Sequence, residues 1–284
     1  MKQCKNVSPA RRPISNSRHP AIASINRLLE SREEREQAGL FYTEGWRFVF
    51  RALENRFTHV ESLVVTPETP NYALWQRLLH LAREQEIPIV SVTPTVFQYL
   101  SRAEEPQGIG VVVRQPWERL HRIRPDTGLC WLALDTIRSP GNLGTMLRTL
   151  EAVGGAGVIV IGDAIDPFIP EVFRATMGAL FDLRFVRATW GEFQRWRERH
   201  SVSLIGTSPH ATTDYADFAY PDSLVLWMGS ERKGLSDKQQ GECDEVVRIP
   251  MVGASDSLNV AIASGVLLYE IFNQRRLKTT ASKK

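Results

Sequence analysis

The second half of the chain alternates short apolar segments with longer segments of helical spacing. Strand candidates lie at 129–134, 157–161, 203–206, 224–228 and 245–249. Helical candidates lie between or after them, at 144–153, 170–180, 190–199 and 258–276. Apolar strands separated by helices are typical of a parallel sheet covered on both faces. We therefore predict an α/β domain whose functional loops follow the carboxyl ends of its strands.

The first 115 residues show the same alternation on a smaller scale. A helix is predicted over 20–39, with Gly39 as its stop. Strands are predicted at 60–66, 88–92 and 109–114, and helices at 72–86 and 94–103. The stretch QPWERLHRIRPDTG then breaks the pattern with prolines and charges. We predict a small α/β domain over 1–115, a linker over 116–127 and a larger domain over 128–284.

Composition excludes several classes of protein. The 284 residues are 43% hydrophobic and 24% charged, which is ordinary for a globular protein. No apolar run approaches the roughly 20 residues of a membrane helix, and MKQCKNVSPARR lacks the apolar stretch of a secretory signal. The cysteines Cys4, Cys130 and Cys243 are too few for a disulfide framework or a zinc site. We expect a cytoplasmic protein that needs no membrane and no metal.

Positive charge is concentrated at the two ends of the chain, although the net charge is only +3. The first acidic residue is Glu30, and the basic residues before it are Lys2, Lys5, Arg11, Arg12, Arg18 and Arg27. The C-terminus, RRLKTTASKK, is also basic. Such ends can bind nucleic-acid phosphates, but they are equally common as solubilising tails. Charge alone leaves both interpretations open.

The first candidate site segment is LALDTIRSPGNLGTMLRTLEAVG, which runs from a strand ending at Asp135 into a helix that carries Arg148. The predicted loop between them contains Pro140, Gly141, Asn142 and Gly144. Glycine backbone at a helix N-terminus can bind phosphates or carboxylates, although an ordinary strand–helix connection has the same pattern. The segment is neither a P-loop nor a dinucleotide fingerprint, because the Gly-Lys-Ser/Thr and G-x-G-x-x-G spacings are missing.

The second segment, LVLWMGSERKGLS, places Gly229 and Glu231 directly after an apolar strand. Because Gly229 has no side chain, a ligand could approach its backbone closely. The carboxylate of Glu231 could accept hydrogen bonds from hydroxyl or amine groups. A polar turn after a buried strand would have the same composition.

The third segment, VVRIPMVGASDSLNVAIASGVLLYEIF, breaks after a strand and continues into a helix. Ser257 is the expected N-cap of a helix that starts at Leu258. Asn259 offers both an amide donor and a carbonyl acceptor at the start of that helix. A capped core helix would satisfy each part of this pattern by itself.

Taken together and in this order, the three segments resemble the SpoU family of RNA ribose methyltransferases, within the SPOUT class. The family's motifs correspond here to SPGNLGTMLRTLEAVG, LWMGSERKGLS and IPMVGASDSLNVAIA. The stretch RATMGALFDL is similar to a further conserved segment, with Thr176 where the family often has serine. The resemblance covers 129–276. The stretches LFYTEGWRFVFRAL and QGIGVVV are similar to the small ribosomal-protein-like, substrate-binding domain that many members carry.

The resemblance implies a fold and a cofactor. Members carry a trefoil knot in the catalytic domain, form homodimers through that domain, and bind S-adenosylmethionine mostly through backbone groups of the second and third motifs. The positions that would hold the cofactor in this chain are Thr207, Ser208, Gly229, Ile249, Met251, Ser257 and Leu258.

The resemblance also implies the transfer of a methyl group to a ribose 2′-hydroxyl. Arg148 occupies the position of the family's catalytic arginine. A guanidinium is a poor base, so we expect Arg148 to position a phosphate and to stabilise the developing alkoxide. A structural salt bridge is the alternative for Arg148. We expect Asn142 and Glu231 to order the site, and Asn259 to hold its loops together.

The resemblance makes RNA the expected partner, with ribosomal RNA the first choice of substrate and transfer RNA the second. The N-terminal domain would bind the RNA. Two readings from other classes remain: a non-catalytic RNA-binding member of the family, and a dehydrogenase of the Rossmann type. The presence of Asn142, Arg148, Glu231 and Asn259 together argues against the first. The missing dinucleotide fingerprint argues against the second.

Overall fold

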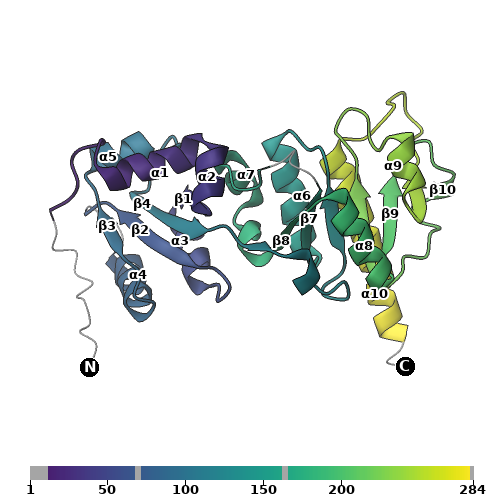
Figure 1. Ribbon diagram of the computed structural model, residues 1–284, viewed down its shortest axis with the longest axis horizontal. Coiled ribbons are helices and arrows are strands. Elements are labelled where there is room, and N and C mark those ends of the chain that lie inside the picture. The colour runs from purple at the N-terminus through teal and green to yellow at the C-terminus, as the bar shows by residue number, and fades with distance from the viewer. Residues whose placement is uncertain (1–11, 68–71, 162–165, 282–284) are drawn as a thin grey trace. The chain divides into compact units, whose positions relative to one another are not determined.

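A computed structural model describes residues 12–67, 72–161 and 166–281 of the chain (Figure 1). It divides into two compact units. The first comprises the residues up to Gln115 together with Phe168–Phe173, and the second comprises Pro116–Pro167 and Arg174–Lys284. Cys4 and the basic residues Lys2, Lys5 and Arg11 lie outside the described residues. In the part that is described, no helix combines the length and the apolarity needed to cross a bilayer.

The first unit is built on a four-stranded mixed sheet with the strand order β1-β4-β2-β3. Strand β4 is antiparallel to both β1 and β2, whereas β2 and β3 are parallel. The strands are β1 (Leu40–Glu44), β2 (Val60–Val65), β3 (Ile89–Ser91) and β4 (Ile109–Arg114). The helices are α1 (Pro20–Glu30), α2 (Arg32–Ala38), α3 (Trp46–Glu54), α4 (Tyr72–Glu84) and α5 (Pro94–Leu100). Helices α1 and α5 contribute to one apolar cluster with the strands. The small α/β domain predicted from the sequence is confirmed as a fold.

The single helix predicted over 20–39 is wrong, because the chain breaks at Ser31. Ser31 has an extended conformation (φ −121°, ψ 124°) and separates α1 from α2. Its side chain accepts a hydrogen bond from the backbone N–H of Glu34 at 3.3 Å, which caps the second helix. The predicted stop is confirmed, since Gly39 has the left-handed conformation that ends α2.

An aromatic segment from the second half of the sequence completes the core of the first unit. The rings of Phe168 and Phe41 stack with centroids 5.2 Å apart, and Phe173 meets Phe48 edge-to-face at 5.6 Å. Both Phe168 and Phe173 are buried. A boundary placed near residue 115 therefore separates this segment from the core to which it contributes.

The second unit is built on an eight-stranded sheet with the order β10-β12-β9-β11-β6-β7-β8-β5. Every strand pairing in it is parallel, which confirms the predicted sheet type. The strands are β5 (Trp117–Glu118), β6 (Trp131–Leu134), β7 (Gly157–Ile161), β8 (Arg184–Ala188), β9 (Ser203–Thr207), β10 (Thr213–Asp214), β11 (Leu224–Met228) and β12 (Glu245–Arg248). The predictions missed β5, β8 and β10 of this sheet and β1 of the first, and β5 lies in the segment expected to be a linker.

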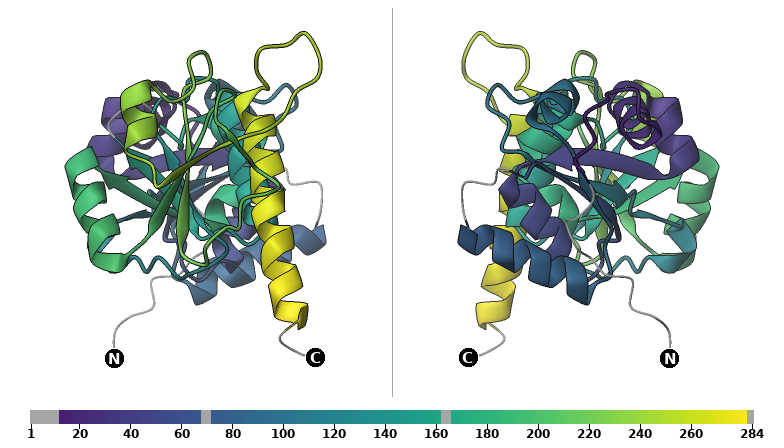
Figure 2. Two further views of the ribbon diagram at one scale, coloured as in Figure 1. Left: turned by 90° about the vertical axis from the view of Figure 1, so that its right-hand side faces the viewer. Right: turned by 90° about the vertical axis from the view of Figure 1, so that its left-hand side faces the viewer.

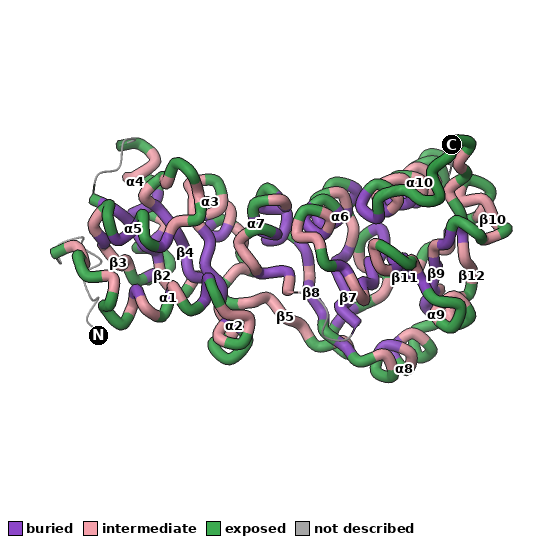
Figure 3. The backbone as a smooth tube through the Cα atoms, turned by 90° about the horizontal axis from the view of Figure 1, so that it is seen from above, coloured by how far each residue is buried: buried purple, intermediate pink, exposed green. Residues whose placement is uncertain are grey.

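Helices cover both faces of this sheet, and the central strands β6, β7 and β11 are buried along their whole length (Figure 3). Trp131 and Ala133 of β6 pack with Phe193 and Trp196 of α8 on one face. The opposite face carries α6 and α10, which pack against each other (Figure 2). The helices of this unit are η1 (Leu120–Arg122), α6 (Pro140–Ala152), η2 (Ala179–Asp182), α8 (Trp190–His200), α9 (Asp237–Gly241) and α10 (Val260–Ala281). Helix α7 (Pro170–Thr176) is divided between the units, because its residues up to Phe173 belong to the first.

Two helix starts differ from the predictions. Helix α6 begins at Pro140, because Ser139 caps it by accepting a hydrogen bond from the backbone N–H of Asn142 at 3.4 Å. The predicted glycine-rich loop is therefore the first turn of a helix, and proline at its first position has a compatible φ. Ser257 is not the N-cap of α10. That helix begins at Val260, and its cap is Asn259, whose Oδ1 accepts from Ala261 N at 2.9 Å.

Candidate active site

The three motif segments follow strands that are neighbours in the sheet. Strands β12, β9, β11 and β6 are adjacent in this order, and all are parallel, so their carboxyl ends lie at the same edge. Thr207 ends β9 and is paired with Val247 of β12. Gly229 follows β11, and Ile249 follows β12. The topology thus brings together segments that are far apart in the sequence.

A hydrogen-bond network joins the three motifs. Glu231 Oε1 accepts from Asn142 Nδ2 at 2.8 Å and from the backbone N–H of Ser139 at 2.9 Å. Asn142 Oδ1 in turn accepts from Asn259 Nδ2 at 3.0 Å. Asn142 belongs to the first motif, Glu231 to the second and Asn259 to the third. The expectation that these three residues order the site thus has a geometric basis, although their roles in the reaction stay a proposal.

The chemistry of the groups sets the orientation of both amides. An ionised carboxylate can only accept, so Asn142 must turn its Nδ2 toward Glu231. Its Oδ1 is then left for Asn259, which must present its own Nδ2 and keep its Oδ1 for the cap of α10. The charge of Glu231 therefore orients, through two amides, the N-terminus of the last helix.

The environment of Glu231 keeps its carboxylate ionised. Partial burial raises the pKa, but hydrogen bonds from the Asn142 side chain and from the backbone of Ser139 and Arg138, with the charge of Arg138, outweigh it. The net pKa of Glu231 is below its ordinary value. A carboxylate held in this way is a poor proton acceptor and a good fixed anchor.

Gly229 is required by the loop itself. A Cβ at this position would lie 2.1 Å from the carbonyl carbon of Gly234 and 2.3 Å from the nitrogen of Leu235. The loop folds back because Ser230 and Gly234 exchange two backbone hydrogen bonds, at 3.0 and 2.9 Å. The chain's own backbone therefore requires glycine at position 229, in addition to the expected close approach of a ligand.

The chain between β12 and α10 offers its backbone to a ligand. Among the described residues, 249–258 take part in no backbone–backbone hydrogen bond. Residues 252–259 are exposed, while Ile249 and Met251 are half-buried. Leu258 is 38% exposed and precedes α10. Unpaired backbone donors and acceptors beside apolar side chains suit a cofactor that is recognised by its adenine and ribose, so these residues fit that type of ligand.

The remaining expected cofactor residues lie at the same sheet edge. The backbone N–H of Ser208 donates to Val247 O at 3.1 Å, which extends the contact between β9 and β12 past the end of β9. Ser208 is buried and Thr207 half-buried. Ser257 lies in the exposed chain before α10 and makes no hydrogen bond with any described residue.

Arg148 is exposed on α6 and is not part of the network. It forms no ion pair and no hydrogen bond with any residue that the structure describes. The alternative of a structural salt bridge therefore has no partner among those residues. Arg148 lies six residues beyond Asn142, which is ~9 Å along a helix axis. Its guanidinium is available to an external anion.

Two contributors to the site were missed from the sequence. Ser139 was quoted only as part of a motif, yet it both caps α6 and donates its backbone N–H to Glu231. The Ser-Pro pair is a recognisable start of a helix and could have identified it. Gln239 of α9 donates to Asp135 Oδ2 at 2.9 Å, tying the end of β6 to the segment after the second motif. No short-range pattern pairs these two residues.

A parallel sheet with polar, backbone-rich loops at the ends of adjacent strands defines a ligand-binding α/β domain. Residues 130–269 match the SpoU rRNA Methylase family, and residues 19–110 match the MRM3-like substrate binding domain. The chain is 33% identical over 283 residues to a 23S rRNA (uridine(2479)-2′-O)-methyltransferase of Streptomyces viridochromogenes, covering 97% of this chain and 96% of that protein.

Solved structures share the fold over most of the chain. One is an rRNA methyltransferase from Sinorhizobium meliloti with bound AdoMet, with a TM-score of 0.84, 31% identity and coverage of 92% of this chain and 97% of that one. Another is the SpoU methyltransferase AviRb from Streptomyces viridochromogenes in complex with AdoMet, with a TM-score of 0.82, 32% identity and coverage of 91% and 98%. The chain belongs to the SpoU rRNA methylase family.

Proposed function

We propose that this protein transfers the methyl group of S-adenosylmethionine to a ribose 2′-hydroxyl of ribosomal RNA. The observation that carries the proposal is the network through Glu231, Asn142 and Asn259, which joins all three motifs beside an unpaired stretch of backbone. The similarity over nearly the whole chain to a 23S rRNA 2′-O-methyltransferase supports both the reaction and the class of RNA.

The loops at the ends of β9, β11 and β12 would hold the cofactor. When bound, S-adenosylmethionine supplies an electrophilic methyl group on a sulfonium sulfur. The backbone of 249–258 would bind adenine and ribose by hydrogen bonds, and the half-buried side chains of Ile249 and Met251 would contact the apolar parts. Ser208 and Gly229 would shape the neighbouring wall through the contacts already described.

The residues of this chain would position the reacting hydroxyl rather than deprotonate it directly. Glu231 is not the base, because hydrogen bonds occupy its carboxylate and lower its pKa. Arg148 would bind a phosphate next to the target ribose and stabilise the negative charge that develops on the 2′-oxygen as its proton leaves. An exposed guanidinium without a partner among the described residues can take this role without losing a structural contact.

The first unit is the proposed RNA-binding part of the protein. Its match to a substrate-binding domain supports this assignment. On its surface, the guanidinium of Arg56 lies 4.7 Å from the ring centroid of Phe57, which is 77% exposed. An exposed aromatic ring can stack on an unpaired base, and a guanidinium beside it can bind the phosphate of the same nucleotide.

The proposal includes a homodimer formed through the second unit, in the cytoplasm where ribosomal RNA is modified. Ile262 and Tyr269 lie seven residues apart on one face of α10, and they are 56% and 49% exposed. An apolar row on an exposed helix suits contact with a second copy. The trefoil knot stays a prediction that rests on the family resemblance.

The cellular test is to map 2′-O-methyl groups in ribosomal RNA from strains with and without the gene. One 2′-O-methyl position should disappear in the deletion strain and return when the intact gene is restored. An unchanged pattern of ribosomal RNA methylation, with a lost 2′-O-methyl group in a transfer RNA, would replace the proposed substrate by transfer RNA.

A further inference from the structure

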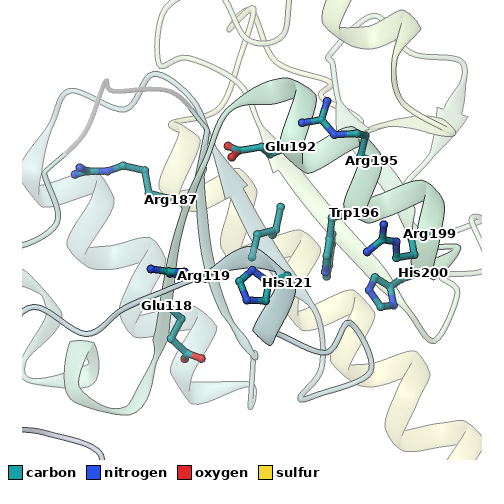
Figure 4. Close-up of a pocket in the computed structure, with 10 residues that line it drawn as sticks. Glu118, Arg119, His121, Arg187, Glu192, Arg195, Trp196, Arg199 and His200 are labelled. Carbon is teal, nitrogen blue, oxygen red and sulfur yellow. The ribbon is translucent and has the colours of Figure 1, made fainter.

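A cavity lies in the second unit, on the face of the sheet that α8 covers (Figure 4). Helices α6 and α10 lie on the opposite face of this sheet (Figure 2). The volume of the cavity is about 540 Å³. Strands β5 and β8, the turn η1 and helix α8 form its walls. The basic side chains that line it are Arg119, His121, Arg187, Arg195, Arg199 and His200. Strands β5 and β8 are at the opposite end of the sheet from β12, so this cavity is distinct from the motif loops.

The positive charge of the cavity is not neutralised from within. Four arginines face two carboxylates, those of Glu118 and Glu192. Glu118 is already engaged, because Arg184 donates two hydrogen bonds to it, both at 2.7 Å. Glu192 is engaged in a capping box, accepting from the backbone N–H and the hydroxyl of Thr189 at 2.8 and 2.7 Å. The lining arginines therefore outnumber the lining carboxylates, and one of these carboxylates, Glu118, is already paired with an arginine outside the lining.

Three of the arginines have no structural partner. The side chains of Arg119, Arg195 and Arg199 are exposed and form no ion pair or hydrogen bond with any described residue. Arg195 has only the longer-range attraction of Glu192. Arg195 and Arg199 are four residues apart on α8 and therefore lie on one face of the helix. Like charges at this spacing destabilise a helix, and a bound anion would remove that penalty.

The floor of the cavity is aromatic and rigid. Trp196 is 6% exposed and packs in the core cluster beneath α8. Its ring lies 5.6 Å from that of His200, and the guanidinium of Arg187 lies 4.5 Å from the ring of Trp117. Packing of this kind limits the motion of His200 and Arg187, so less conformational entropy is lost when these two groups bind a ligand.

We propose that this cavity binds the phosphodiester backbone of the substrate RNA, as a second contact outside the methyl-transfer loops. One planar guanidinium can donate two parallel hydrogen bonds to the oxygens of a phosphate. Several guanidinium groups spread around one cavity match consecutive phosphates rather than a single small anion. The inference rests on the proposed function, because it takes RNA as the substrate. Backbone contacts of this type position an RNA without selecting its sequence.

The test uses full-length protein with the double variant Arg195→Gln/Arg199→Gln. The control is Lys238→Gln/Arg124→Gln, which removes two exposed charges of the same unit outside the cavity. Affinity for an unmodified transcript of 23S rRNA is measured over a range of salt concentrations, and methyl transfer is measured at saturating S-adenosylmethionine. A further variant, Arg119→Gln, changes the opposite wall of the cavity and lies outside α8.

The cavity variant is expected to raise KM for the transcript on the order of tenfold with kcat unchanged. Losing two phosphate contacts should reduce the slope of log Kd against log salt by roughly 1.4–1.8. Arg119→Gln should reduce it by about half as much, and the control should leave it unchanged. Binding of S-adenosylmethionine, measured by calorimetry, should be wild-type in every variant, which shows that each one is folded.

Salt slopes and KM values equal to those of the control would overturn the proposal. Tight binding of inorganic phosphate or of an acidic peptide to the wild-type cavity, with RNA affinity unaffected by the variants, would also overturn it. Failure of the proposed function can be told apart from failure of this proposal. If the function were wrong, the wild-type protein would bind S-adenosylmethionine and transfer no methyl group to RNA, whereas the salt slopes of RNA binding would still be measurable.

Discussion

At the scale of single residues, Asn259 serves two purposes. Its Oδ1 caps α10, and its Nδ2 holds Asn142 in the orientation that Glu231 requires. The sequence indicated an amide with both a donor and an acceptor, but it suggested Ser257 as the cap. Ser, Asn and Asp are comparably good N-caps, so residue preference alone cannot choose between positions two apart.

The substitution Asn259→Asp separates these two purposes. Aspartate still caps α10 but cannot donate to Asn142, so stability to denaturant should change by less than about 1 kcal/mol while methyl transfer falls at least about tenfold. Asn259→Ala should lose both the cap and the link, with an additional cost of about 1 kcal/mol. Urea unfolding and steady-state kinetics measure the two effects. Wild-type turnover in Asn259→Asp would show that the link to Asn142 is dispensable.

Glu231 gives the site a defined dependence on acid. Its pKa is lower in the folded protein than the ordinary value of 4.5, so its ionised form stabilises the fold. This contribution is complete above that value and is lost as the pH falls through the lower, folded pKa. The difference in unfolding free energy between the wild type and Glu231→Gln should therefore be constant above about pH 5 and shrink below about pH 4.5. A difference independent of pH from 7 down to 3 would contradict the assigned environment.

At the scale of secondary-structure elements, α6 packs closely against Ala175, near the end of α7. A Cβ on Gly144 would lie 2.2 Å from the Ala175 Cβ and 2.9 Å from its carbonyl carbon. The neighbouring Gly141 is exposed and has only Ser139 Oγ, at 3.8 Å, near the equivalent position. Two glycines of one motif thus have different reasons to be glycine, which their spacing alone did not reveal.

These two glycines provide a matched pair of substitutions within one helix. Gly144→Ala forces α6 away from Ala175 and should destabilise the protein by about 1–3 kcal/mol. Gly141→Ala has free space and should stabilise the helix by up to about 1 kcal/mol, since alanine is the better helix former. Thermal or urea unfolding of both variants measures the effect. Equal stabilities for the two variants would mean that the packing of α6 against Ala175 is not close.

Elements marked by a continuous sequence pattern could be predicted, whereas boundaries that depend on one hydrogen bond could not. Strands β7 and β11 were predicted with their observed ends, because each is an uninterrupted apolar run buried on both faces. The break at Ser31 and the start of α6 at Pro140 depend on single capping hydrogen bonds inside otherwise helical patterns. Strand β8 was missed because Arg184 and Arg187 interrupt its apolar pattern.

At the scale of the whole molecule, the sequence predicted a parallel sheet but not its strand order. Strand β11 lies between β9 and β6, and this placement brings the second motif beside the first. Pairings between distant segments leave no trace in local periodicity, so the three motifs could be grouped only through the family resemblance. The contribution of Phe168–Phe173 to the core of the first unit is of the same kind.

This packing also determines how RNA binding by the first unit can be tested. Deleting residues 1–115 would remove Phe41 and Phe48 from Phe168 and Phe173 and expose buried aromatic surface. A full-length variant, Arg56→Gln/Phe57→Ala, is therefore the better probe. It should weaken binding of a 23S rRNA transcript by roughly tenfold, through the loss of stacking and of a phosphate contact, and leave S-adenosylmethionine affinity unchanged. RNA affinity equal to the wild type would remove this surface from the account.

The proposed dimer depends on the apolar face of α10. Ile262→Glu places a charge in that face and should convert dimers to monomers at micromolar concentration, because an unpaired buried charge is costly. Sedimentation velocity measures the mass, and Thr280→Glu, exposed near the end of the same helix, serves as the control. A dimer that survives Ile262→Glu would show that the dimer contact lies elsewhere. A monomeric wild-type protein would exclude the dimer.

Methyl transfer in a purified system tests whether this protein is a ribose 2′-O-methyltransferase of ribosomal RNA. Wild-type protein, S-adenosylmethionine carrying a labelled methyl group and unmodified 23S rRNA transcript are incubated, and the RNA is digested to nucleosides for mass spectrometry. One labelled 2′-O-methylnucleoside is expected. Arg148→Ala should reduce its rate at least about a hundredfold while S-adenosylmethionine binding is retained. Label on a base would contradict transfer to the ribose, and wild-type turnover by Arg148→Ala would contradict the role proposed for Arg148.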